Sequence, residues 1–284
     1  MRTRLLFAAA AFFAALLVFA APSLRAARAP AAAALPAGES AAKAALDHSP
    51  RHGEYVDIPY EGHVPLRTWV VYPERKDKAG VVLVVHEIFG LSDWIRGVAD
   101  QLAAEGFIAV APDLISGLAP GGGGTDSLAS RDDVVKLVRQ LTPAESAARI
   151  AAVRAWAAKL PSANGKLGTV GFCWGGGRSF ACAATDPAPQ AAVVFYGSPP
   201  DSVQLLQVRA PVLGHYGGDD ARINATIDAT KATLTALKRE YEPHVYEGAG
   251  HGFLRQQDGR DGANLKATQQ AWPVTVGFLR KHLR

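Results

Sequence analysis

Short apolar runs alternate along this chain with longer stretches in which apolar residues recur at helical spacing. The short runs are rich in Val, Ile and Ala and carry few charges, which is typical of strands covered on both faces. They predict strands at residues 66–72, 81–86, 107–111, 167–172, 191–196, 212–216 and 244–247. The longer stretches predict helices at residues 94–105, 143–160, 177–185, 224–239 and 265–282. This alternation predicts an α/β fold with a doubly wound, mostly parallel sheet and helices on both faces.

The N-terminal residues follow a different pattern. Arg2 and Arg4 precede an unbroken apolar run at residues 5–21, and the small residues Ala27 and Ala29 follow it. This order is typical of a secretory signal peptide. We therefore expect cleavage of residues 1–29 and export to the periplasm or the medium, with no stable membrane association afterwards. Because the apolar run approaches the length that spans a bilayer, an uncleaved membrane anchor is the alternative.

Composition divides the remaining chain into two parts. Residues 30–53 are rich in Ala and Pro and predict a flexible tether. Residues 54–284 are numerous enough for a single α/β domain with a sizeable core. Without the leader the chain holds 26 basic and 26 acidic side chains, so it is formally neutral. Neutrality and the lack of basic clusters argue against a nucleic-acid partner.

The most informative motif surrounds Cys173. It lies in Gly-Phe-Cys-Trp-Gly-Gly, residues 171–176, directly after one predicted strand and before a predicted helix. Glycines on both sides of such a turn permit a strained backbone that exposes the central side chain at the edge of the sheet. A thiol held there can attack a carbonyl carbon while the next backbone N–H stabilises the oxyanion. The alternative is an ordinary buried core thiol.

The second cysteine, Cys182, follows Cys173 on the same predicted helix. Nine helical residues span about 13 Å, which exceeds the roughly 7 Å Cα separation that a disulfide permits. We therefore expect both thiols to be free and Cys182 to pack in the core.

Other chemical groups also follow predicted strands directly. They are Glu87, the pair Asp219 and Asp220, and His251. Because the carboxyl ends of parallel strands meet at one edge of a sheet, these groups are expected to converge on Cys173. Nucleophile, acid and histidine in this chain order are typical of α/β-hydrolase triads, in which the histidine moves protons and the acid orients it.

At these motifs the chain resembles the dienelactone hydrolase family, or carboxymethylenebutenolidases. The resembling segments, within residues 54–284, are VVLVVHEIFGL, APDL, GFCWGGG, YGGDD and GAGHGF. The resemblance implies an α/β-hydrolase fold and a cysteine nucleophile that hydrolyses small esters or lactones with no cofactor and no metal. A thioesterase or an amide or peptide hydrolase is an alternative, because pocket shape sets acyl specificity. A non-catalytic binding protein is the alternative from another class.

The resemblance also implies residue roles. Cys173 matches the nucleophile, His251 the base and Asp220 the triad acid, which in the family follows a Gly-Gly-x spacing. Asp219 is adjacent and stays the other candidate for the acid. Glu87 matches a carboxylate that contacts the resting thiol and takes part in activating it.

Backbone groups and arginines complete the implied site. The N–H groups of Ile88 and Trp174 match the oxyanion hole, and Arg255 matches a residue that pairs with a substrate carboxylate. Arg131 is the candidate for a second substrate-binding arginine, with a solvated surface residue as the alternative. The nearby glycine tract at residues 121–124 departs from the family's pattern and predicts a mobile lid or a slack loop.

Overall fold

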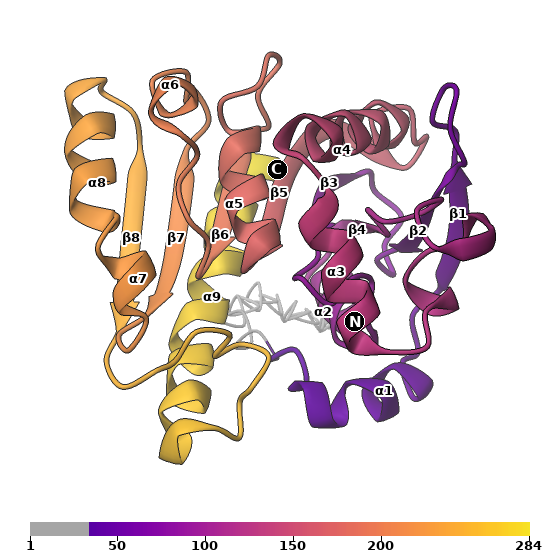
Figure 1. The fold of residues 1–284 in the computed structure, drawn as a ribbon, viewed down its shortest axis with the longest axis horizontal. Helices are drawn as coiled ribbons and strands as arrows, with labels where there is room; N and C mark the ends of the chain where they lie inside the picture. Colours follow the sequence, from indigo (N-terminus) through magenta and orange to yellow (C-terminus); the bar gives the residue numbers. More distant parts are fainter. Residues whose placement is uncertain (1–33) are drawn as a thin grey trace, which may run out of the picture. The chain divides into compact units, whose positions relative to one another are not determined.

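The computed structural model describes residues 34–284, which are organised around an eight-stranded sheet (Figure 1). The strand order is β1-β2-β4-β3-β5-β6-β7-β8. Strand β2 is antiparallel to both of its neighbours, and all other neighbouring strands are parallel. The predicted α/β fold with a mostly parallel sheet is therefore confirmed. The predicted signal peptide at residues 1–29 lies outside the described residues.

The predicted strands correspond to β2–β8, and β1 was not predicted. The strands are β1 (Gly53–Ile58), β2 (Leu66–Val71), β3 (Ala79–Val85), β4 (Ile108–Pro112), β5 (Ala163–Phe172), β6 (Ala191–Phe195), β7 (Val212–Gly217) and β8 (Tyr241–Tyr246). The α-helices are α1 (Glu39–Asp47), α2 (Asp93–Ala104), α3 (Arg131–Gln140), α4 (Pro143–Ala157), α5 (Trp174–Cys182), α6 (Ser202–Leu205), α7 (Ala221–Asn224), α8 (Ile227–Ala236) and α9 (Ala263–Leu283). None of these helices is both long enough and apolar enough to cross a membrane.

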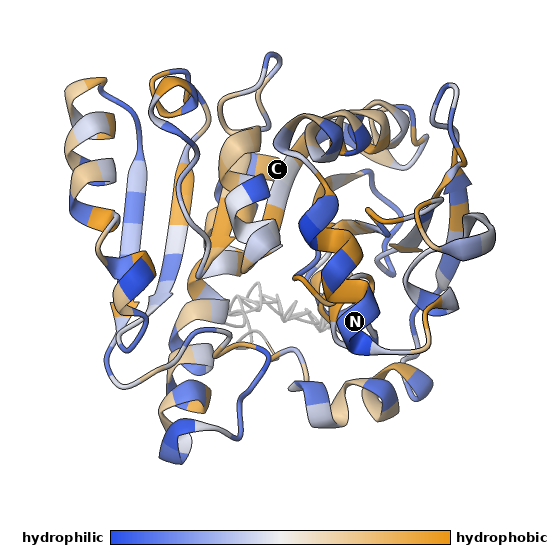
Figure 2. Ribbon diagram, in the orientation of Figure 1, coloured by the Kyte–Doolittle hydropathy of each residue, from blue (hydrophilic) through white to orange (hydrophobic). Residues whose placement is uncertain are grey.

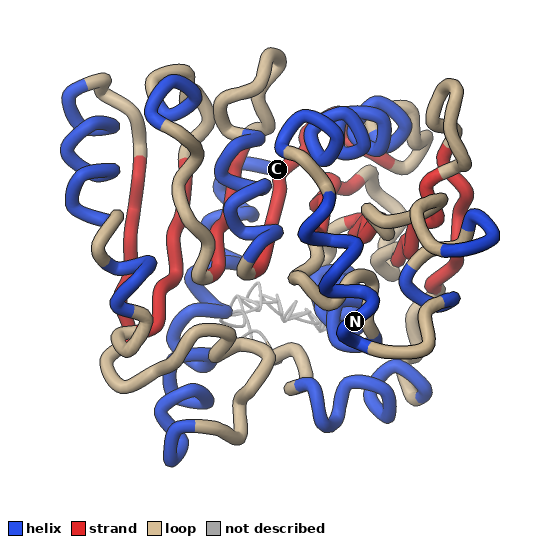
Figure 3. Tube along the Cα trace, in the orientation of Figure 1, coloured by secondary structure: helices blue, strands red, loops and turns tan. Residues whose placement is uncertain are grey.

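Helices cover both faces of the sheet, so the strands form a layer between them (Figure 3). One face packs against α2 and α9, with Trp94 and Trp272 fully buried. The other face packs against α3 and α4 over β3 and β4, and against α5 and α8 over β6 and β7. Every residue of β6 is buried, and Figure 2 shows it as hydrophobic along its length. Burial on both faces explains why the strands lack an alternating polar pattern.

Helix α1 lies where the sequence predicted a flexible tether. Ala42 of α1 is buried in the same core as α2. Glu39 N–H donates to the carbonyl of Arg255 at 2.9 Å, which ties the start of the helix to a distant loop. The prediction of a tether at residues 30–53 is therefore wrong from Glu39 onward. A helix that buries only a small alanine face leaves little hydrophobic pattern in the sequence.

The end of the glycine tract at residues 121–124 is a pinned turn. The carboxylate of Asp113 accepts hydrogen bonds from Thr125 N–H at 2.6 Å and from the Thr125 hydroxyl at 2.9 Å. A Cβ on Gly124 would lie 2.2 Å from Asp113 Oδ2, so a glycine is needed for this close approach. The prediction of a mobile lid or slack loop is wrong at this end of the tract, because a buried carboxylate holds it.

Candidate active site

The turn between β5 and α5 presents Cys173 at the carboxyl edge of the sheet. Its backbone has φ 54° and ψ −116°, which is a strained conformation for a residue with a Cβ. Cys173 N–H donates to the carbonyl of Phe195 at 3.0 Å. A Cβ on Gly175 would lie 2.2 Å from the carbonyl oxygen of His86, and one on Gly171 would lie 2.0 Å from that of Gly175. These glycines let the end of β3 pack directly against the turn.

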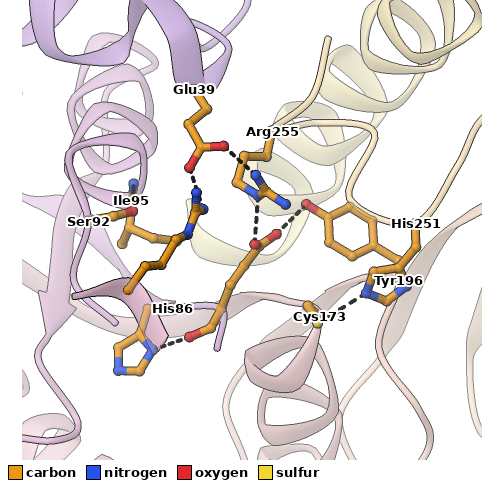
Figure 4. A network of polar contacts seen from close by, with 10 residues as sticks. Glu39, His86, Ser92, Ile95, Cys173, Tyr196, His251 and Arg255 are labelled. Carbon is orange, nitrogen blue, oxygen red and sulfur yellow. Dashed lines mark hydrogen bonds and ion pairs between the residues drawn. The ribbon is translucent and has the colours of Figure 1, made fainter. Parts of the chain in front are cut away.

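His251 and Asp220 form a hydrogen-bonded line with the thiol. His251 Nε2 lies 3.0 Å from Cys173 Sγ (Figure 4), and Nδ1 lies 2.5 Å from Asp220 Oδ2. Because an ionised carboxylate can only accept, Nδ1 carries the proton and Nε2 turns its lone pair toward the thiol. The structure thus brings together the three side chains that the sequence singled out at separate strand ends.

The neighbouring carboxylate, Asp219, points elsewhere. Its Oδ2 accepts a hydrogen bond from Arg260 at 2.7 Å, and both side chains are about half exposed. Asp220 is buried against His251 instead. Of the two acidic candidates, only Asp220 contacts the imidazole.

Glu87 is almost fully buried and is held by two donors. Its Oε1 accepts from the Tyr196 hydroxyl at 3.1 Å, and its Oε2 accepts from Arg255 Nε at 2.8 Å. Burial raises the pKa of Glu87, while Arg255 and the Tyr196 hydroxyl oppose that shift. Within residues 34–284 no hydrogen bond joins Glu87 to Cys173. Glu87 nevertheless acts on the thiol through its charge, which raises the pKa of Cys173, while its own oxygens accept from Tyr196 and Arg255.

His86 fixes the backbone that carries Glu87. Its Nδ1–H donates to the carbonyl of Glu87 at 2.6 Å, and its Nε2 accepts from Leu114 N–H at 3.1 Å. This bonding requires a neutral ring, and burial lowers the pKa of His86 in agreement. The imidazole also stacks on Trp174 with 5.6 Å between ring centroids. His86 therefore connects β3, the loop after β4 and the start of α5.

The resting thiol of Cys173 is neutral at ordinary pH. Burial raises its pKa to about 11, and the negative charge of Glu87 adds to the increase. The Trp174 N–H, Arg222 and Arg255 oppose the shift. The thiol therefore needs a proton acceptor before it can act as a nucleophile.

Trp174 and Ile88 are the residues whose backbone N–H groups the sequence suggested for an oxyanion hole. Trp174 is the first residue of α5, so its N–H lies at the positive end of the helix dipole. Ile88 follows Glu87, two residues after His86, whose carbonyl oxygen packs against Gly175 of the turn. Among the described residues neither N–H donates to a backbone carbonyl. The Trp174 N–H is directed at the Cys173 thiol and lowers its pKa, so it lies beside the reacting atom.

A cavity of about 440 Å³ opens beside Cys173 and His251. Trp174 contributes an aromatic wall, and Arg178 and Arg222 contribute positive charge. Neither arginine takes part in the ion pairs of residues 34–284. A larger hollow of about 650 Å³ lies between α4 and α5, but neither Cys173 nor His251 lines it. The smaller cavity is therefore the candidate substrate site.

The two arginines named from the sequence converge on a residue that the sequence did not indicate. Arg255 Nη1 and Arg131 Nη2 donate to opposite oxygens of the Glu39 carboxylate, and Figure 4 shows Glu39 facing Arg255. The ring of Phe89 lies 3.6 Å from the Arg131 guanidinium and 4.8 Å from that of Arg255. Tyr196 was also missed, although a polar group at the end of the apolar run 191–196 offered a signal. Glu39 offered none.

A sheet of this order, with a strained turn between β5 and α5, defines the α/β-hydrolase class. Residues 66–283 match the Dienelactone hydrolase family. The chain belongs to this family and is a hydrolase of the dienelactone hydrolase type.

Similar proteins support the same assignment. A Salmonella typhimurium protein named "Putative carboxymethylenebutenolidase" is 32% identical over 228 residues, which cover 76% of this chain and 82% of that protein. An Escherichia coli K12 protein of the same name is 30% identical over 241 residues, covering 80% and 86% of the two chains. The crystal structure of a "Putative Dienelactone Hydrolase" from Klebsiella pneumoniae matches with a TM-score of 0.70 at 29% identity, covering 81% of this chain and 99% of that one.

Proposed function

We propose that the protein hydrolyses small ester or lactone substrates through Cys173, His251 and Asp220. The reaction would need no cofactor. The observation that carries this proposal is the hydrogen-bonded line from Asp220 through His251 to the thiol at the strained turn. The adjoining cavity of about 440 Å³ is large enough for a small acyl substrate.

The first half of the reaction forms an acyl-enzyme. His251 Nε2 takes the thiol proton as Cys173 Sγ attacks the carbonyl carbon, so that an S–C bond forms and the carbonyl oxygen becomes an oxyanion. The N–H groups of Ile88 and Trp174 stabilise this oxyanion. When the intermediate collapses, the C–O bond to the alcohol breaks and His251 returns the proton to the departing oxygen. In a lactone that oxygen stays attached to the acyl chain.

The second half releases the acid. His251 Nε2 takes a proton from water as the water oxygen attacks the thioester carbon. Collapse breaks the S–C bond, the proton returns to Cys173, and the carboxylic acid leaves. Throughout both halves, Asp220 holds the imidazole in one tautomer and stabilises its protonated form.

The surroundings of the thiol suit activation only in the presence of substrate. A thiol whose pKa is raised to about 11 gives little thiolate at neutral pH. The proton must therefore move to His251, 3.0 Å away, in the attacking step itself. Glu87 disfavours a free thiolate, which limits side reactions of the resting enzyme.

The test compares Cys173→Ala with the matched control Cys182→Ala, which removes the buried thiol of α5. Hydrolysis of 4-nitrophenyl acetate and of a small lactone is followed in both variants and in the wild-type enzyme. Cys173→Ala is expected to lose all turnover with a nearly unchanged thermal midpoint, whereas Cys182→Ala stays active. Turnover that survives in Cys173→Ala ends the assignment of the nucleophile.

We further propose that the leader directs export, as the pattern of residues 1–29 indicates. The exported protein would begin within a few residues of Pro30. N-terminal sequencing of protein from the periplasm or medium tests this, and a sequence that starts at Met1 contradicts it.

A further inference from the structure

We infer that Glu39 is a built-in counter-ion for Arg131 and Arg255 and makes the enzyme select acyl substrates that carry no carboxylate. The inference rests on the proposed function, since it concerns the substrates that reach Cys173. It assigns a specificity role to α1, a segment that lies before the residues matched to the family.

Both oxygens of the Glu39 carboxylate are engaged by arginines. Its Oε2 accepts from Arg255 Nη1, and its Oε1 accepts from Arg131 Nη2. The Arg255 side chain is only 10% exposed, so water screens its ion pair weakly. Guanidinium groups bind carboxylates in a fixed geometry. In this protein both of them already hold a carboxylate of the chain itself.

The carboxylate is held in place by its backbone. Glu39 N–H donates to the carbonyl of Arg255 at 2.9 Å, and Gln257 Nε2 donates to the carbonyl of Pro36 at 2.8 Å. Ala42, one turn further along α1, is buried against α2. A substrate carboxylate must therefore compete with a tethered one, whose effective concentration is far higher than that of a free small molecule.

Charge balance leads to the same conclusion. Glu39 and Glu87 together offset Arg131 and Arg255, and we call these four residues the charge cluster. No member of the charge cluster lines the cavity beside Cys173. A substrate in that cavity therefore meets no unpaired charge from the cluster.

A purely structural role for Glu39 predicts something different. If the ion pairs only anchored α1, loss of the Glu39 charge would change stability and leave the reactivity toward charged and neutral reagents in the same ratio. A counter-ion role predicts that this ratio changes, because the four residues then carry one net positive charge and one of them, Arg255, already acts on the Cys173 thiol.

The test uses a pair of reagents that differ only in charge. Iodoacetate and iodoacetamide both alkylate thiols, and the rate at Cys173 is read by peptide mass mapping, with buried Cys182 as an internal reference. We expect Glu39→Gln to raise the ratio of the iodoacetate rate to the iodoacetamide rate about tenfold, as one partly screened charge would. Glu39→Ala, which also removes the atoms that fill the site, should raise it at least as much. The gain should shrink at high salt.

The matched control is Asp47→Asn. Asp47 lies on the same helix and pairs with Lys43 on the exposed surface, so its loss should leave the ratio unchanged. An unchanged ratio in both Glu39 variants overturns the inference. An equal rise in Asp47→Asn also overturns it, because the effect would then be one of overall charge.

Hydrolysis separates this inference from the proposed function. The substrates are mono-4-nitrophenyl succinate and its methyl ester, and the Glu39 variants are expected to gain on the first relative to the second. If the wild-type enzyme hydrolyses the neutral ester but the preference does not shift in the variants, only the inference fails. If no hydrolysis depends on Cys173, the proposed function fails, and the claim about substrates fails with it.

Discussion

The line Cys173–His251–Asp220 contains the reactive thiol, and the charge cluster acts on that thiol through Glu87 and Arg255. The two regions differ in how exposed they are and in how their polar groups are used. The middle member of the line, the His251 imidazole, is one-third exposed and borders an open cavity. The cluster is centred on Glu87 and Arg255, which are nearly buried and use their polar atoms on each other and on the chain. An acceptor that is free to exchange protons with substrate is suited to chemistry. A set of mutually paired charges is suited to fixing the electric field around the thiol.

The largest effect should come from the acid of the line. Asp220→Asn removes the acceptor that fixes the imidazole tautomer, and we expect kcat/KM to fall about 10³-fold. Asp219→Asn is the matched control and should change kcat/KM by less than about twofold, because Asp219 pairs with Arg260 at the surface. Steady-state kinetics with one ester measures kcat/KM for both variants. An equal loss in the two would contradict the claim that Asp220, and not Asp219, supports the imidazole.

A smaller effect is expected from Glu87→Gln in the charge cluster. Alkylation needs the thiolate, so its rate at a fixed pH below about 11 rises when the pKa of Cys173 falls. Removing the negative charge of Glu87 lowers that pKa, and we expect iodoacetamide to react about tenfold faster at pH 8. Ester turnover should nevertheless fall, because Gln cannot form the buried ion pair that Glu87 makes with Arg255.

The pH profile of alkylation provides the measurement. Glu242→Gln, at an exposed position on β8, controls for loss of a carboxylate elsewhere. If the midpoint of the pH profile is the same in Glu87→Gln as in the wild-type enzyme, Glu87 does not act on the thiol. Turnover at the wild-type rate shows that it takes no part in activation.

The strained backbone of the turn at Cys173 should affect the free energy of unfolding. Cys173 has φ 54°, so Cys173→Gly should be more stable than Cys173→Ala by about 1 kcal/mol. At Cys182, which lies in α5, glycine should instead be less stable than alanine by about 1 kcal/mol. Urea unfolding of the four variants measures both differences. The same sign at both positions would rule out strain as the cause.

The smallest effect is expected from a substitution of Arg222, which lines the cavity beside the thiol. Arg222 helps to lower the pKa of Cys173, so Arg222→Gln should raise it and slow alkylation at pH 8 about twofold. Arg239→Gln, outside the cavity lining, is the control. The difference should disappear in high salt, and faster alkylation in Arg222→Gln would contradict the sign.

The sequence predicted the line better than the charge cluster for a physical reason. Cys173, Asp220 and His251 each follow an apolar strand, and parallel strands bring their carboxyl ends to one edge. The contacts of Glu39 instead join residues 92 and 216 positions apart. The helix that carries Glu39 has only one buried residue, an alanine, so no hydrophobic pattern in the sequence predicted this helix.

Helix α3 illustrates the same limit. Its sequence RDDVVKLVRQ is mostly polar, and only Val134 and Val138 are buried, so it was not predicted. Arg131 begins this helix, and its partner Glu39 begins α1. The ion pair between them could not be predicted, because neither helix was. Sequence reasoning could locate the chemical groups that end strands, but not the tertiary contacts between polar helix ends.

The central claim is that the Cys173 thiol carries the acyl group during hydrolysis. The most direct measurement mixes the enzyme with 4-nitrophenyl acetate, quenches in acid within the first turnover and maps the modified peptide by mass spectrometry. Our account predicts one acetyl group on Cys173 in the wild-type enzyme and none in Cys173→Ala. An acetyl group on a different residue, or turnover by Cys173→Ala without any acyl-enzyme, would contradict it.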